Sequence, residues 1–172
     1  TITYTPNSNF NGNDTLIYRI TDSNGDVDTA LVVITVNAVN DAPLVVRDDI
    51  SVIEDIETIF NVLSNDSDIE GTLDTATILI TQNPTHGTAS VNPNGTITYT
   101  PTTNYKGLET LIYQVCNKGT PALCDTALVV FIVTAVNDAP VANRNDISTA
   151  FNTLVAIPIL NNDADTEGVL DT

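Results

Sequence analysis

Acidic residues stand at alternate positions in two loops of this chain. The six positions are Asp66, Asp68, Glu70, Asp163, Asp165 and Glu167. Alternation can bring carboxylates to one side of a loop, where they repel one another unless a cation lies between them. Calcium accepts six to eight oxygen ligands from carboxylates and carbonyls in flexible geometry. The pattern predicts calcium at these loops; the alternative is that Asp66 and Asp68 form Asx turns.

The two cysteines, Cys116 and Cys124, stand at the two ends of one predicted hairpin. Strands that leave a turn can place such residues opposite each other, within reach of a disulfide. A metal site would require further Cys or His nearby, and a redox pair is typically Cys-x-x-Cys. The spacing therefore predicts a structural disulfide, which implies an oxidising, extracellular location.

Three further patterns are interpreted as structural. The segment from Asp22 to Asp28 resembles the start of a calcium loop, but Val33 stands at the twelfth position, where such a loop has Glu. We expect a hairpin turn there. His86, the only histidine, lies in a predicted turn with no nucleophile motif beside it. Asp48 and Asp49 form an acid pair with no implied cleft, so we expect no catalytic site.

The composition favours β-strands as the elements that position these residues. The chain has 172 residues, with 22 acidic and 5 basic side chains and a net charge of -17. Abundant Thr, Val and Ile suit a pleated sheet, while Asn, Asp, Gly and Pro supply turns. The acidity speaks against nucleic acid, because phosphate binding requires clustered Lys and Arg. No apolar stretch approaches the ~18 residues that span a membrane as a helix.

The sequence repeats itself. Residues 1–6 recur as 96–101, an offset of 95, and residues 39–43 recur as 136–140, an offset of 97. The two extra residues fall in the hairpin that carries the cysteines. The repeating unit has the size of an immunoglobulin domain, about 100 residues.

These offsets divide the chain into three predicted parts. Residues 40–136 form one complete β-sandwich repeat, residues 1–39 the C-terminal part of a preceding repeat, and residues 137–172 the N-terminal part of a following repeat. A half sandwich cannot bury its own sheet faces. We therefore expect the protein to continue in both directions. The alternative is that the end parts of neighbouring chains complement each other.

Alternation and turn residues predict about seven strands in the complete repeat. The predicted runs are 44–53, 57–63, 76–82, 87–92, 95–100, 109–117 and 123–135. The pair Asn94-Gly95 is a tight hairpin signal. Seven short strands at this spacing are typical of an immunoglobulin-like sandwich, so the predicted fold class is all-β.

Several motifs occur in a characteristic order along this pattern. They lie at residues 39–43 (Val-Asn-Asp-Ala-Pro), 63–71, 86–88, 95–101, 104–107 and 111–113. Their order and spacing resemble the bacterial cadherin-like, immunoglobulin-like tandem repeats of large surface adhesins, the VNDAP repeat family. The resemblance covers the whole chain. It implies tandem Greek-key β-sandwiches of the cadherin-like type.

The resemblance also extends the predicted calcium sites to the linkers. A cadherin linker joins Asp and Asn residues to acidic residues of adjacent domains around calcium, which implies Asp41 and Asp138 as ligands. Four further residues are weaker candidates: Asn40, Asp49, Asn137 and Asp146. Ala38 and Ala135 replace the first Asp of the cadherin linker, so fewer ions per junction are expected. The implied role is mechanical, since calcium would stiffen the junction.

Four Asp-Thr-aliphatic sequences resemble the acceptor motif of O-glycosylation in Bacteroidetes. Their threonines are Thr15, Thr29, Thr75 and Thr126. The alternative interpretation is that Asp-Thr simply begins a strand. Intact mass or sugar density at these threonines distinguishes the two.

Together these patterns predict a non-catalytic repeat segment of a long secreted cell-surface protein, the calcium-stiffened stalk or spacer of an adhesin. The expected partners are neighbouring repeats of the same polypeptide or filament, and an unidentified surface ligand or glycan. Two alternatives are a subunit of an extracellular surface filament and an accessory, carbohydrate-binding region of a secreted enzyme. A carbohydrate module usually exposes aromatic residues. The matched tyrosines Tyr4, Tyr18, Tyr99 and Tyr113 are instead predicted as core or pleat residues.

Overall fold

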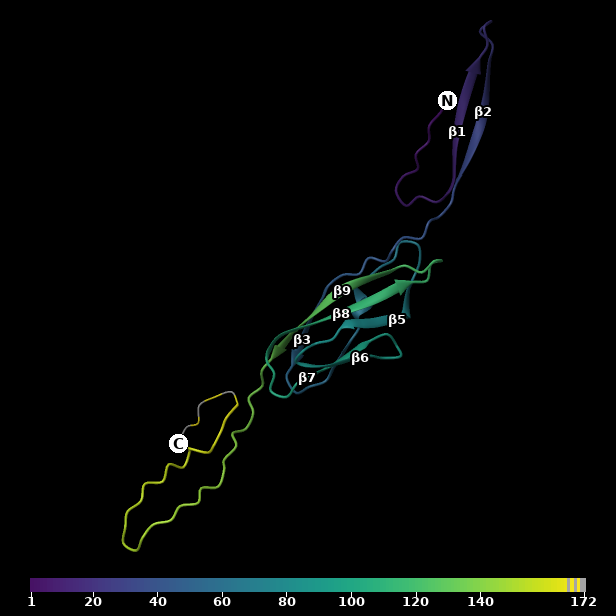
Figure 1. Ribbon diagram of the computed structural model, residues 1–172. Coiled ribbons are helices and arrows are strands. Elements are labelled where there is room, and N and C mark those ends of the chain that lie inside the picture. Colours follow the sequence, from purple (N-terminus) through teal and green to yellow (C-terminus); the bar gives the residue numbers. More distant parts are fainter. Residues whose placement is uncertain (167, 169, 171–172) are drawn as a thin grey trace.

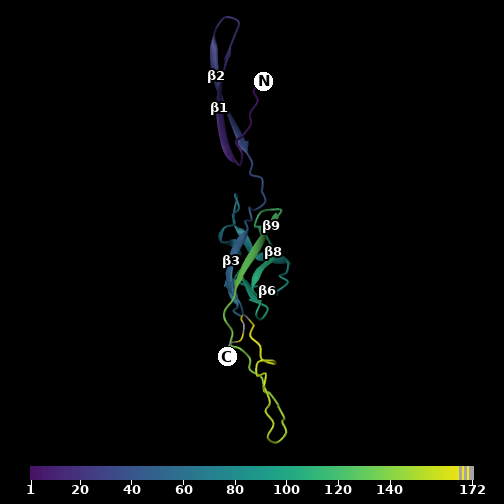
Figure 2. The ribbon, with the colours of Figure 1, turned by 90° about the vertical axis from the view of Figure 1, so that its left-hand side faces the viewer.

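The computed structural model describes residues 1–166, 168 and 170, and its regular elements are almost all strands. They are arranged in a row (Figures 1 and 2). A hairpin of β1 (Gly12–Thr21) and β2 (Val27–Val36) lies at one end, a sandwich in the middle and the C-terminal segment at the other end. No helix among the described residues is long and apolar enough to cross a membrane.

The sandwich consists of two sheets. Its four-stranded sheet has the order β3 (Asp48–Ile53), β9 (Cys124–Thr134), β8 (Gly107–Asn117) and β5 (Leu73–Gln82). Its three-stranded sheet has the order β4 (Thr58–Phe60), β7 (Ile97–Pro101) and β6 (Gly87–Val91). Among the described strands of the sandwich, β3 and β9 pair in parallel and the other pairs are antiparallel. The predicted all-β, immunoglobulin-like sandwich is thus confirmed.

The core lies between the two sheets and follows the alternation of the strands. Tyr113 of β8 and Tyr99 of β7 are both fully buried. Phe131 of β9 stacks on Tyr99 at 4.0 Å between ring centroids, and it meets Phe60 of β4 edge-on at 5.4 Å. Aromatic pairs in these geometries stabilise a core beyond the area they bury. The core prediction for Tyr99 and Tyr113 is therefore confirmed.

Two predicted strands differ from the observed elements. The run at 57–63 is a strand only as far as Phe60, and a short 3-10 helix, η1 (Val62–Ser64), follows. Asn61 caps it by accepting a hydrogen bond from the Leu63 amide at 3.1 Å. The helical turn directs Val62 into the core, where it is fully buried. The run at 44–53 becomes a strand only at Asp48, because its first residues pair with the acidic loop instead of a neighbouring strand.

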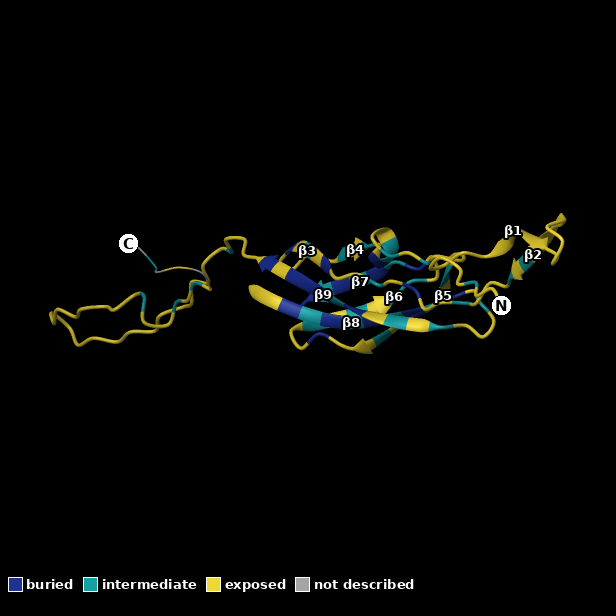
Figure 3. Cartoon of the chain, turned by 90° about the horizontal axis from the view of Figure 1, so that it is seen from above, coloured by how far each residue is buried: buried dark blue, intermediate teal, exposed yellow. Residues whose placement is uncertain are grey.

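Most residues of both end segments are exposed, as the yellow in Figure 3 shows. Tyr18, the counterpart of Tyr113, is 38% exposed, and Leu154 near the other end is 96% exposed. Residues 1–6 form no strand, although residues 96–101, at which their sequence recurs, contain β7. Strand β7 pairs with β4 and β6, and residues 1–39 hold no counterparts of these two strands.

The C-terminal segment nevertheless begins as the complete repeat does. Leu44 forms an isolated antiparallel bridge with Ser67, and Val141 forms the same bridge with Ala164. Both pairs are related by the offset of 97 that the sequence shows. The repeat is therefore present in the hydrogen bonding as well as in the motifs.

Candidate functional site

The linker that enters the complete repeat is fixed at the first junction, where residues 37–43 meet the sandwich. The Asn40 Nδ2 atom donates to the Pro121 carbonyl at 2.9 Å and to Asn117 Oδ1 at 3.3 Å. The next residue, Asp41, donates its backbone amide to Glu70 Oε2 at 2.9 Å. The linker is thus hydrogen-bonded both to the β8–β9 hairpin and to the acidic loop.

Asn117 lies at the centre of this junction and is 2% exposed. Its Oδ1 atom accepts from the amides of Gly119 at 3.2 Å and Leu123 at 3.0 Å, which shapes the hairpin. Its Nδ2 atom lies 2.7 Å from the Asp41 carbonyl and 2.9 Å from Asp68 Oδ2. The sequence prediction missed this residue. The signal that marks it is its counterpart at the offset of 95, Asp22, a polar residue at the same end of the preceding hairpin.

The hydrogen bonds of Asp66 are to residues of the sandwich and not to the linker. Its Oδ1 atom accepts from the Val46 amide at 2.8 Å, and its Oδ2 atom accepts from the Tyr113 hydroxyl at 2.8 Å. Asp163 repeats the first contact by accepting from the Asn143 amide at 2.6 Å. Asp66 and Asp163 therefore hold the first segment of their repeats in place. The contacts of Asp66 are long-range and differ from the local Asx turn that was the alternative to calcium at this residue.

The weaker candidates from the first strand are paired with arginines. Asp49 forms a salt bridge with Arg47, and Asp146 forms the same bridge with Arg144, each at 2.5 Å. All four side chains are exposed, so these pairs contribute little to stability. These salt bridges join Asp49 and Asp146 to arginines and not to the other predicted calcium ligands.

The remaining predicted ligands belong to the second junction, where the complete repeat meets the C-terminal segment. Asn137 donates from Nδ2 to the Asp138 carbonyl at 2.9 Å, within the linker. Asp165 accepts from the Gly168 amide at 2.5 Å in the second acidic loop. Glu167 lies outside the described residues.

Glu54 is a residue of the second junction that the sequence prediction missed. It follows β3, is 2% exposed, and accepts from the Val136 amide of the linker at 2.6 Å through Oε1. Its Oε2 atom is buried and has no hydrogen-bond partner among the described residues. The adjacent Asp55 accepts from the Asn104 amide at 3.0 Å. A single acid at a strand end gives little signal, but Glu54 and Asp55 together form an acidic pair where the next linker begins.

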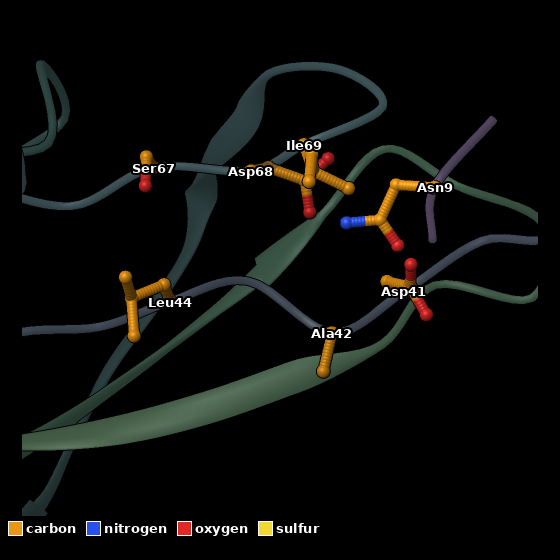
Figure 4. Close-up of a pocket in the computed structure, with 7 residues that line it drawn as sticks. All are labelled: Asn9, Asp41, Ala42, Leu44, Ser67, Asp68 and Ile69. Carbon is orange, nitrogen blue, oxygen red and sulfur yellow. The ribbon is translucent and has the colours of Figure 1, made fainter. Parts of the chain in front are cut away.

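The same loop of one repeat meets the same loop of the next repeat at both junctions. Asn104, with a positive φ of 57°, donates from Nδ2 to the Thr166 hydroxyl at 3.3 Å. Asn9, with a φ of 60°, occupies the matching place in the preceding repeat. Figure 4 shows Asn9 beside the linker and the acidic loop, in an open pocket that it lines with six other residues. They are Asp41, Ala42, Leu44, Ser67, Asp68 and Ile69. Ile69 is the counterpart of Thr166.

The family model described as bacterial Ig domain matches residues 1–35 and 40–131 of this chain. The chain belongs to the bacterial Ig domain family. Members of this family are generally non-catalytic. The family and the disulfide are consistent with an extracellular location. No curated protein matches the chain.

Solved structures place these bacterial Ig repeats beside cadherin domains in fold. The cis-dimer structure of protocadherin gammaB7 EC3-6 is 16% identical over 80% of this chain and 36% of that chain, with a TM-score of 0.52. The extracellular cadherin domains 3–6 of protocadherin Gamma B2 are 16% identical over 79% of this chain and 35% of that chain, with a TM-score of 0.50. An endo-fucoidan hydrolase of glycoside hydrolase family 107 is 16% identical over 76% of this chain and 20% of that chain, with a TM-score of 0.43. This chain thus spans about a third of the two protocadherin chains.

At the junctions of these bacterial Ig repeats, one carboxylate oxygen lacks a hydrogen-bond partner among the described residues. Among the described residues, no three His, Cys, Asp or Glu side chains are gathered as a metal site. However, Glu54 buries a carboxylate oxygen with no proton donor beside it. Such an oxygen is costly to bury unless a donor or a cation balances it. A proton or a cation would balance this oxygen of Glu54, between the complete repeat and its linker.

The disulfide prediction is confirmed. Cys116 and Cys124 are directly opposite each other in the β8–β9 pairing, and their sulfur atoms are 1.99 Å apart. The bond therefore closes the hairpin whose tip carries Asn117 and contacts Asn40. The preceding bacterial Ig repeat has Thr21 and Val27 at the matching places, so the hairpin does not require the bond.

Glu109 explains the environment of His86. The Glu109 carboxylate is 5% exposed and accepts from the Thr85 hydroxyl at 3.1 Å, the Thr110 amide at 2.7 Å and the His86 amide. The His86 ring lies 3.0 Å from the same carboxylate and stacks on Tyr105 at 4.2 Å. The His86 side chain, in the connection between β5 and β6, thus covers the buried carboxylate of Glu109. This agrees with the predicted place of His86 in a turn.

The four threonines of the Asp-Thr motifs are all exposed, namely Thr15, Thr29, Thr75 and Thr126. In three of the motifs the Asp side chain accepts the amide of its own Thr at 2.7–2.8 Å. In the fourth, Asp74 accepts the amide of Ala76 at 3.2 Å. The exposure suits a modification site, while the local bonds suit the alternative in which Asp-Thr begins a strand.

Proposed function

We propose that this chain is a non-catalytic repeat segment of a long secreted cell-surface protein and serves as a spacer that calcium stiffens at a junction between repeats. The buried, unbalanced Oε2 atom of Glu54 beside the linker carries the proposal. Repetition supports it, because the Asn9 and Asn104 loops take the same place at the two junctions. The role as the stalk of an adhesin belongs to this proposal.

The end segments are proposed as parts of further repeats. In the complete repeat, Tyr113 is fully buried by the opposite sheet, whereas its counterpart Tyr18 is 38% exposed. The C-terminal segment leaves Phe151 and Leu154 more than nine-tenths exposed. Covering such side chains contributes roughly 1.5–3 kcal/mol each. The strands that would complete the partial repeats of residues 1–39 and 137–172 would supply that cover.

We place the proposed ion at the second junction. Glu54 would hold it from the complete repeat, and Asp138 of the linker and Asp165 of the following loop, which are not gathered with it as a metal site, would have to approach it on binding. Bound calcium would neutralise carboxylates that otherwise repel one another, and it would join the two repeats at one point. Extracellular modules of this kind bind calcium at about 10⁻⁴–10⁻³ M.

Calcium binding is tested with the variant Glu54→Gln, which keeps the size of the side chain and removes its charge. Millimolar calcium should raise the Tm of the wild type above its value in chelator, by an amount equivalent to about 1 kcal/mol. Glu54→Gln should lose this response. Glu57→Gln, an exposed residue of the same turn, is the matched control and should keep it.

Small-angle scattering of the same samples reports the mechanical role. Calcium should increase the maximum dimension of the wild type and of Glu57→Gln, or narrow the distribution of their molecular dimensions. It should do neither in Glu54→Gln. Identical melting and scattering with calcium and with chelator would exclude calcium stiffening. A full response in Glu54→Gln would exclude this residue as a ligand.

A further inference from the structure

Three oxygen atoms surround the side-chain nitrogen of Asn117. The Asn40 Oδ1 atom lies 3.0 Å from it, the Asp41 carbonyl oxygen 2.7 Å and Asp68 Oδ2 2.9 Å. An amide oxygen, a backbone carbonyl and a carboxylate are the oxygen types that calcium binds, at about 2.3–2.6 Å. Here an NH₂ group lies among them instead, on a side chain that is 2% exposed.

The two hydrogens of this group account for the arrangement. One hydrogen is donated to Asn40, which returns a bond from its own Nδ2 at 3.3 Å, so that the two amides form a reciprocal pair. The other hydrogen is left for the Asp41 carbonyl and the Asp68 carboxylate, whose oxygen atoms both lie within hydrogen-bond distance of Nδ2. A hydrogen bond to a charged acceptor is stronger than one between neutral groups. The amide therefore joins the linker to the acidic loop without a metal ion.

The hairpin is shaped to receive the linker. An added Cβ at Gly119 would lie 1.8 Å from Asn40 Oδ1, so a side chain at this position would displace Asn40. Asn117 and Gly119 thus form one receiving surface for Asn40. The disulfide closes the same hairpin one residue before Asn117.

The matching position of the preceding repeat shows what a carboxylate does there. Asp22 accepts the amides of Asn24 at 2.9 Å and Asp26 at 2.8 Å through Oδ1, as Asn117 accepts two amides of its own hairpin. Asp and Asn therefore both hold two amides of their own hairpin through Oδ1. They differ in the second atom, because an oxygen there cannot donate to the carbonyl and carboxylate oxygens around it.

We infer that the Asn117 amide takes the place of a cation at the first junction, so that the linker is locked onto the complete repeat without calcium at this position. The inference deepens the proposed spacer function and rests on it. The two junctions of the chain then differ. Hydrogen bonds close the first, whereas the second retains the unbalanced oxygen of Glu54.

The test converts the amide to a carboxylate in a background that lacks the proposed calcium ligand of the other junction. The proteins are Glu54→Gln alone and the same protein with Asn117→Asp or with Asn117→Ala. With Asn117→Asp, the Tm in chelator should fall by about 5 °C or more, and millimolar calcium should restore most of it. Asn117→Ala should melt low in both conditions, because it has neither donor nor ligand. Magnesium should restore much less than calcium, because it demands a stricter geometry.

Two results would overturn the inference. One is an Asn117→Asp protein that melts in chelator as its parent does, and the other is one that gains nothing from calcium. If neither variant folds, nuclear magnetic resonance of the wild type decides. The side-chain amide signals of Asn117 should persist unshifted during a calcium titration, and their loss or movement would refute the inference. The Val136 amide beside Glu54 reports the second junction in the same spectra, so a failure of calcium binding there is seen separately.

Discussion

At the scale of single residues, the sandwich balances its buried carboxylates in different ways. Burial raises the pKa of Glu109, but hydrogen bonds, first from the amides of Thr110 and His86, outweigh it and leave that pKa below its usual value. Glu54 keeps one oxygen unbalanced at the second junction. Asp48 of β3, which is 6% exposed, also has a buried oxygen without a partner among the described residues. Balanced acids therefore support the fold, whereas unbalanced ones require a proton or a cation.

Asp48 is expected to take the proton. Burial and then the negative charge of Asp66 raise the pKa of Asp48 to about 6. The unfolded chain has a value of about 3.9 at this residue. Because the folded state binds the proton more tightly, stability falls as the pH rises from about 4 to about 6, and the full penalty is present above pH 6. It amounts to about 2–3 kcal/mol.

The variant Asp48→Asn should therefore stabilise the protein near neutral pH by about 1–2 kcal/mol and give almost no gain near pH 4. The following repeat already has Asn145 at the matching place, so the change suits the fold. Chemical unfolding at several pH values in chelator measures the effect. Asp49→Asn, an exposed neighbour, is the control and should change stability little at either pH. A stabilisation by Asp48→Asn that does not vary with pH would contradict the explanation.

At the scale of elements, local pattern was enough for some parts and not for others. The predicted run 109–117 became β8 (Gly107–Asn117), because its inward residues alternate without interruption. The helical turn η1 was missed, since an apolar pair at Val62 and Leu63 looks like the end of a strand. The disulfide was predictable because both cysteines belong to one hairpin.

The junction residues show where local pattern fails. Glu54 is hydrogen-bonded to Val136, 82 residues further along the chain, and Asn117 is hydrogen-bonded to Asn40, 77 residues earlier. Neither belongs to the acidic loops or to the linker motifs from which the calcium sites were predicted. Their importance arises when the sandwich brings a strand end or a hairpin tip next to a linker. The acidic loops were visible in the sequence, but the partner of each carboxylate was not.

The disulfide gives a prediction at this scale. Reduction, or replacement of both Cys116 and Cys124 by Ala, should lower the free energy of unfolding of the complete repeat by about 2–3 kcal/mol. The closed loop is short, with a sequence separation of 8, so the loss of chain entropy on closure is modest. Denaturant unfolding with and without reductant provides the measurement. The double-Ala variant is the control, because reductant should not change its stability. A reductant effect in that variant would assign the loss to something other than this bond.

At the scale of the whole molecule, the junctions connect a row of acidic repeats. The chain carries a net charge of -17. This charge is spread over parts that lie one after another and are joined at the two junctions (Figure 1). Like charges on neighbouring repeats repel over about 8 Å at physiological ionic strength. Extension can thus arise from repulsion alone or from fixed junctions. The two causes respond differently to salt.

Scattering at rising sodium chloride separates these causes. In chelator, added salt should reduce the radius of gyration, because screening lets the second junction bend more freely. In millimolar calcium the radius should change little with salt, since a bound ion at Glu54 would hold the second junction and hydrogen bonds hold the first. Glu54→Gln should behave in both solutions as the wild type does in chelator. An equal response to salt with calcium and with chelator in the wild type would mean that charge repulsion, and not a calcium-held junction, extends this chain.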